Sequence, residues 1–227
     1  GRRLPSGNRK FEITGVEELE EAARSFGLLP FFWSGVPGFS VEDMTPPRCW
    51  FAGDVDGPWE WRMEVARRGE IAYGKLFAGK AGFVTREYYP DLANYRRDGY
   101  DFDARYEDGL ADHRDKLIID ALTHNGPLLT KELRRASGVD KGFETCLTRL
   151  QMQTYITVCG FEYLHDRHGR PYGWGVARYA LSEELFGAGM VRSAYSRPPA
   201  ESRFRLLARL RELCPSGDDK LLNKLIK

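Results

Sequence analysis

Two glutamines, Gln151 and Gln153, are the residues of this chain whose type and spacing could most readily do chemistry. A side-chain amide donates and accepts hydrogen bonds, so two amides aimed at one point could orient a water molecule. Residues two apart share a face on a strand but not on a helix, so such a pair requires extended backbone. Two structural interpretations stay open beside this one: the amides bond free carbonyls at a helix end, or they meet solvent.

Polar and basic side chains on either side of this pair are candidate contacts with nucleic acid. Residues 131–180 carry eight Lys or Arg against five Asp or Glu, a surplus of +3 in a chain whose formal net charge is +1. Such side chains can reach base edges and phosphates, and the alternative is that they form a solvated face of a domain that contacts protein. The candidates are Lys141, Thr145, Thr148 and Arg149, followed by Arg167, His168 and Arg170.

Metal and cofactor chemistry has little support. His165 and His168 are close in sequence but lack a spaced third ligand, and the acidic segment 101–111 lacks the spacing of a calcium loop. The four cysteines are scattered without a C-x-x-C pair, which favours buried, reduced thiols in a cytoplasmic protein. We therefore expect no metal and no cofactor.

The elements that would position these residues follow a recognisable order. Helical spacing with caps and glycine stops predicts three helices between residues 112 and 153, the second of them short. Two strands around the polar turn 165–170 follow. Helix, short helix, helix and a two-stranded wing is the plan of a winged helix-turn-helix, whose third helix normally enters the DNA major groove. The glutamine pair falls where the third helix runs into the first wing strand.

The rest of the chain completes an α+β prediction. Apolar residues alternate with charged ones from Trp59 to Val65, which predicts a β-hairpin over residues 58–77. The uncharged stretch 26–39 is too short to span a bilayer, so we expect no membrane contact. An amphipathic helix at 202–214 could contact a partner. The predicted parts are a mixed α/β domain (1–100), an acidic linker (101–111), a winged-helix domain (112–185) and a helical tail (186–227).

The stretch Leu150-Gln151-Met152-Gln153-Thr154 resembles the Gln-x-Gln or Gln-x-Asp signature of the AlkZ/YcaQ family of bacterial DNA glycosylases, which are built from winged helices. Over about residues 15–185 the chain also resembles proteins described as AlkZ-related. Those glycosylases are longer and carry several winged helices and a β-barrel, whereas one winged helix can be counted here.

The resemblance implies DNA as partner and a possible role in DNA repair. Enzymes of that family remove cationic N-alkylated bases, which are good leaving groups, and by carry-over Gln151 and Gln153 would hold the attacking water. An Asp at position 153 would add electrostatic stabilisation that a neutral Gln cannot. The alternative from another class is a non-catalytic interaction or regulatory module that forms a homo-oligomer through residues 202–227.

Overall fold

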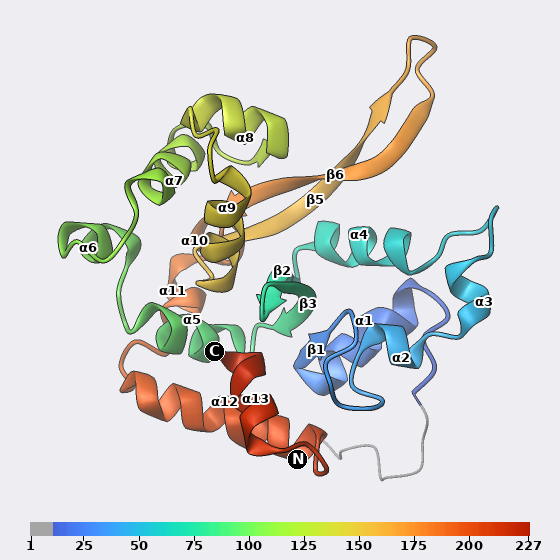
Figure 1. The fold of residues 1–227 in the computed structure, drawn as a ribbon, viewed down its shortest axis with the longest axis horizontal. Coiled ribbons are helices and arrows are strands. Elements are labelled where there is room, and N and C mark those ends of the chain that lie inside the picture. The colour runs from blue at the N-terminus through green and yellow to red at the C-terminus, as the bar shows by residue number, and fades with distance from the viewer. Residues whose placement is uncertain (1–10) are drawn as a thin grey trace.

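The computed structural model describes residues 11–227 and has an α+β fold with two small antiparallel sheets (Figure 1). The part of the predicted N-terminal domain before residue 11 lies outside the described residues. The strands are β1 (Leu28–Pro30), β2 (Ile71–Phe77), β3 (Lys80–Thr85), β4 (Leu128–Leu129), β5 (Ile156–His165) and β6 (Pro171–Leu181). The helices are α1 (Val16–Phe26), α2 (Val41–Met44), α3 (Pro47–Trp50), α4 (Pro58–Arg68), α5 (Tyr89–Arg97), α6 (Phe102–Glu107), α7 (His113–Asn125), α8 (Thr130–Ser137), α9 (Phe143–Met152), α10 (Ser182–Phe186), α11 (Ala188–Val191), α12 (Pro199–Leu213) and α13 (Asp219–Ile226).

The segment predicted as a hairpin over 58–77 is instead helix α4 followed by strand β2, so the strand prediction was wrong for residues 58–68. The helix begins with Pro58 at its first turn, where the Glu60 carboxylate accepts the Gly57 N–H at 2.8 Å. Burial follows the helical period, since Trp61 and Val65 are both in the core. The alternation of apolar and charged residues suggested a strand because bulky apolar side chains lie on the flanks of this helix as well as on its buried face.

The first sheet has the strand order β1–β3–β2, with all pairs antiparallel. β2 pairs with β3 through a tight turn at Ala78-Gly79, so the hairpin of this region lies one strand later than predicted. Because β3 is central, the free edge of β2 faces away from it toward α9.

Between residues 113 and 181 the chain runs α7, β4, α8, α9, β5 and β6. β6 is the central strand of the second sheet, flanked by β4 and β5 in antiparallel pairing. The two long strands extend well beyond the helices, so that their connecting turn projects from the body of the molecule (Figure 1).

The acidic segment 101–111 is folded and contains helix α6. Phe102 is buried and packs edge-on against Tyr155, with 5.3 Å between ring centroids. The segment is thus anchored by its aromatic residues, while the predicted domain boundaries at either side of it stay a prediction.

The C-terminal helices complete the second of two apolar cores. The amphipathic helix predicted at 202–214 has an apolar stripe of Phe204, Leu207, Leu210 and Cys214. The last three are buried in this core, next to Leu92 of α5. Phe204 is the exposed member of the stripe, with 66% of its surface accessible. Within residues 11–227, every helix is too short or too polar to cross a lipid bilayer.

Candidate functional site

Gln151 lies inside α9 with only 2% of its surface exposed. Its Oε1 accepts the backbone N–H of Lys75 at 3.0 Å, and its Nε2 donates to the carbonyl of Leu147 at 3.1 Å. A Cβ on Gly74 would lie 3.1 Å from that Oε1, so the glycine leaves room for the amide. Both ends of the Gln151 amide are therefore bonded: Oε1 joins α9 to the free edge of β2, whose N–H groups need partners, and Nε2 bonds a carbonyl of α9 itself.

Gln153 sits in different surroundings. It ends α9 with φ −76° and ψ −1°, so the backbone is helical at this residue and the strand begins only at Ile156. Its side chain is half-buried and lines a cavity of about 280 Å³ together with Tyr95, Arg96, Met152 and Lys227. The extended backbone that a converging pair requires is absent here, and the two amides do not meet. A catalytic role for the pair stays a prediction.

Thr154 makes the turn that separates α9 from β5. It has φ +69°, a left-handed conformation in which a β-branched residue is rare and costs about 1–3 kcal/mol. The Thr154 N–H donates to the Gln151 carbonyl at 3.0 Å and the Tyr155 N–H to the Leu150 carbonyl at 3.1 Å. This is the Schellman ending of a helix, with Thr at the position where Gly is usual.

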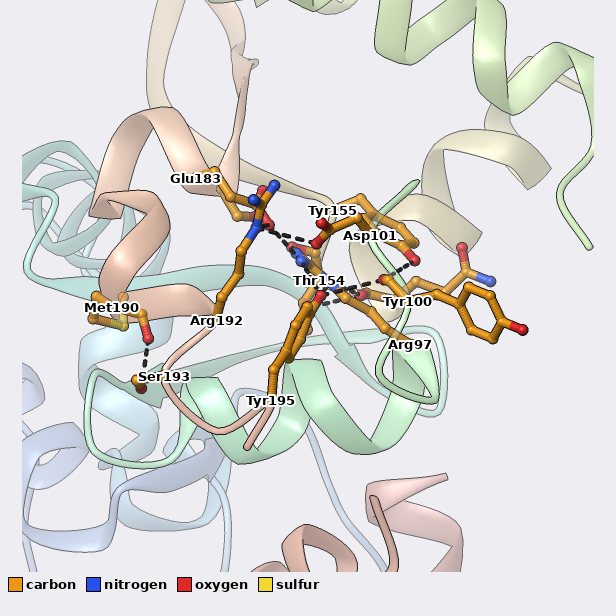
Figure 2. Close-up of polar contacts among 12 residues, drawn as sticks. Arg97, Tyr100, Asp101, Thr154, Tyr155, Glu183, Met190, Arg192, Ser193 and Tyr195 are labelled. Carbon is orange, nitrogen blue, oxygen red and sulfur yellow. Dashed lines mark hydrogen bonds and ion pairs between the residues drawn. The ribbon is translucent and has the colours of Figure 1, made fainter. Parts of the chain in front are cut away.

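Arg97 of α5 holds this strained turn (Figure 2). The side chain is completely buried, and its Nη2 donates to the Thr154 carbonyl at 2.7 Å while Nε donates to the Thr154 hydroxyl at 2.9 Å. Nη1 pairs with the Glu183 carboxylate and donates to the Tyr195 hydroxyl at 3.0 Å. The guanidinium also lies 4.3 Å from the centroid of the Tyr155 ring. Burial opposes the charge, but Glu183 and Tyr195 offset it and the pKa of Arg97 is raised.

Arg96 caps the same helix end without help from a carboxylate. Its Nη1 donates to the Met152 carbonyl at 2.9 Å, and its Nη2 donates to the Leu76 carbonyl at 2.6 Å. Nε reaches the Ile226 carbonyl of α13 at 3.1 Å. Burial lowers the pKa of Arg96 to about 10. The two arginines thus satisfy the carbonyls at the negative end of α9, where positive charge is favoured.

The predicted DNA contacts on α9 divide into two groups. Lys141 and Thr145 are exposed at or just before the start of the helix. Thr148 faces the first sheet, where its hydroxyl accepts the Lys75 ammonium at 3.3 Å. Arg149 forms a bidentate ion pair with the buried Asp115, in which Nε and Nη2 each donate to a carboxylate oxygen at 2.7 Å. This pair raises the pKa of Arg149. Only the first part of α9 therefore presents free polar groups to solvent.

The predicted contacts on the hairpin are all open to solvent. Arg167, His168 and Arg170 are exposed at the tip between β5 and β6. The Asp166 carboxylate accepts the backbone N–H groups of His168 and Arg170 at 2.8 and 2.9 Å, which closes the turn. Within residues 11–227 neither arginine of the tip forms an ion pair, and Arg167 Nε donates to the neighbouring His168 ring at 3.1 Å.

The histidines of this hairpin do not gather with other ligands. Across the part of the chain that the structure describes, no three His, Cys, Asp or Glu side chains lie close enough together to hold a metal ion. The chemistry open to the hairpin is hydrogen bonding and charge pairing by its exposed cations.

Comparison with known proteins adds one match. A protein-family model described as AlkZ related matches residues 13–227, a range that includes both cores, the glutamine pair and the hairpin. A search of curated proteins and a search of solved structures each found no significant match.

Proposed function

The chain belongs to the AlkZ-related family, and from that premise we propose that it binds DNA through a winged helix formed by residues 113–181. The element order α7, β4, α8, α9, β5, β6 supports this assignment, as does the antiparallel sheet with β6 in its centre. In such a domain the third helix and the wing are the parts that contact DNA.

The single observation that carries the proposal is the hairpin tip. Its two arginines are exposed and free of ion pairs among residues 11–227, on a turn that projects from the body (Figure 1). Arginines in this state can pair with phosphates without first breaking an existing ion pair. The Asp166 carboxylate is occupied by backbone N–H groups, so it shapes the tip as well as carrying charge.

A salt titration tests this function. Duplex DNA is added to the protein at low and at moderate salt, and the dissociation constant is measured at each. We expect binding that weakens as salt rises, because phosphate contacts release counterions. Absence of binding even at low salt, where phosphate contacts are strongest, would remove the proposal.

As a second candidate function we propose hydrolysis of the N-glycosidic bond of an N-alkylated base, supported by family membership and by the open position of Gln153. A water held by an amide would form the bond to the sugar carbon. The bond from that carbon to the cationic base would break, its electron pair would leave with the base, and the water would lose a proton to solvent. Gln153 is favoured as the residue that holds this water because its side chain lines a cavity, whereas both ends of the Gln151 amide are already bonded.

Base release tests this candidate. Duplex containing an N7-alkylated base is incubated with the parent protein, Gln151→Ala and Gln153→Ala, at a temperature where all three are folded. We expect release by the parent that is lost in Gln153→Ala. No release by the parent protein ends the proposal, and DNA binding by that same protein would leave the first function standing.

The competing function, an interaction module that oligomerises through residues 202–227, has less support because most of the amphipathic stripe packs inside the chain. Phe204 is the residue that favours it, since a large exposed aromatic can seat in a second copy. The mass in solution of the parent and of Phe204→Ala decides the matter: a dimer lost in the variant supports it, and a monomer in both removes it.

A further inference from the structure

Helix α13 carries a row of lysines along one face. Lys220, Lys224 and Lys227 follow the spacing i, i+4, i+7, which brings them to the same side of a helix, and all three are exposed. The opposite face is apolar and buried, with Leu222 and Leu225 in the second core. At 1.5 Å per residue the row spans roughly 10 Å on a helix that is firmly packed.

Cavities surround this helix and add more cations. One of about 570 Å³ is lined by the three lysines with Arg203, and one of about 280 Å³ joins Lys227 to Arg96 and Gln153. A third, of about 130 Å³, is lined by Lys80 and Lys224. The α13 basic surface is defined here by these cations: Lys80, Arg96, Arg203, Lys220, Lys224 and Lys227.

Negative charge does not balance the α13 basic surface. Among the residues lining the three cavities the one acidic side chain is that of Asp218, and it accepts the backbone N–H of Leu221 at 2.8 Å as the cap of α13. In the described residues the only lysine in an ion pair is Lys116, with Asp120. Arg203 bonds the neutral side chain of Asn223, and Arg96 bonds backbone carbonyls. The surface is therefore positive and open to an anion.

The dimensions of the row suit a chain of phosphates. A duplex carries one phosphate per about 3.4 Å of axis on each strand, so a row of roughly 10 Å extends along about three phosphate steps, within reach of three flexible lysine side chains. Lysines are point charges on flexible stems, which suits the backbone of a nucleic acid better than a fixed carboxylate. One of the cavities also places this charge beside Gln153.

We propose that the α13 basic surface is a second phosphate-binding region, which carries the backbone of a nucleic acid past Gln153; this rests on the proposed DNA binding. It lies at the other end of the molecule from the hairpin tip (Figure 1). The two regions therefore contact separate stretches of one duplex, and the losses caused by removing each add in the logarithm of the affinity. The C-terminal helix then serves the partner DNA rather than a second copy of the chain.

The test is the salt dependence of duplex binding by Lys220→Gln/Lys224→Gln/Lys227→Gln. Gln keeps a similar helix propensity, and the three positions are exposed, so the fold and the thermal midpoint should stay unchanged. Three lost phosphate contacts reduce the slope of log affinity against log salt by about 2.7 and weaken binding roughly tenfold or more at low salt.

A charge-matched control separates the local surface from overall charge. Arg24→Gln/Arg48→Gln/Arg67→Gln also takes the formal net charge from +1 to −2 (1 − 3) at exposed sites outside the three cavities. We expect it to keep most of the slope. Equal losses in both variants, or no change in the lysine variant, would overturn the inference while leaving DNA binding intact.

Two further outcomes are decisive. If the parent protein fails to bind duplex at low salt, the proposed function and this inference fall together. If the lysine variant keeps its DNA affinity but loses binding to vesicles containing phosphatidylserine, the surface is a lipid contact and the inference is overturned.

Discussion

The turn at residues 151–154 and the hairpin tip at residues 165–170 are both rich in polar side chains, yet they use them in opposite ways. In the turn, Gln151 and Thr154 are buried and bonded to partners on α5 and β2. At the tip, Arg167 and Arg170 are exposed and have no ion pair within residues 11–227. The turn stabilises the joint between two parts of the chain, whereas the tip keeps its hydrogen-bonding and charge capacity for a partner.

The difference teaches that residue type alone does not identify a functional site. A buried amide with both ends bonded contributes to stability, and its loss leaves a partner unsatisfied. An exposed cation contributes little to stability and can bind an anion.

The largest effect should come from Arg97. Arg97→Met leaves the Glu183 carboxylate and the Thr154 carbonyl without their buried partner, so we expect the free energy of unfolding to fall by about 3–5 kcal/mol. Chemical denaturation at pH 7 measures it. Arg97→Lys keeps the charge but not the planar guanidinium, so its free energy of unfolding should lie between those of the parent and of Arg97→Met. A loss below about 1 kcal/mol for Arg97→Met would mean that the turn does not depend on this side chain.

The two glutamines provide the sharpest internal contrast. Gln151→Ala leaves the Lys75 N–H unbonded at the edge of β2, so the free energy of unfolding should fall by about 1–3 kcal/mol. Gln153→Ala makes the same chemical change two residues away, where the side chain is half-buried beside a cavity, and should change stability by less than about 0.5 kcal/mol. Denaturation midpoints of the two variants compare them directly. Equal losses would erase the distinction drawn between the two amides.

Asp112 lies between the extremes, because it is one-third exposed yet bonded to the side chain and backbone N–H of Arg114. These bonds lower the pKa of Asp112 from 3.8 to about 2. A lowered carboxyl pKa stabilises the folded state above about pH 4, and this contribution is lost as the pH falls toward 2. Allowing for solvent screening, we expect about 1 kcal/mol from this group. Denaturation at pH 2, 3, 4 and 6 should show a shallower pH dependence in Asp112→Asn than in the parent; identical profiles would contradict it.

The sequence predicted α7, α8, α9, β5, β6 and α12 because caps, glycine stops and periodicity are local signals, but it did not predict the short elements β4, α10 and α11. It missed α4, since the bulky residues from Trp59 to Val65 alternate in a way that also suits a strand. The hydrogen bonds of the turn at residues 151–154 could not be predicted from the sequence. The partner of Gln151 is 76 residues away, and Arg97 lies 57 residues from Thr154, so only the folded chain brings them together.

The smallest effect on stability, and the most direct test, concerns the hairpin tip. Arg167→Gln/Arg170→Gln is compared with the charge-matched Arg24→Gln/Arg48→Gln in titrations of duplex DNA over a range of salt. We predict that the tip variant keeps its unfolding free energy within about 0.5 kcal/mol, and that its slope of log affinity against log salt falls by about 1.8. An unchanged slope and affinity in the tip variant would contradict the assignment of DNA binding to this hairpin.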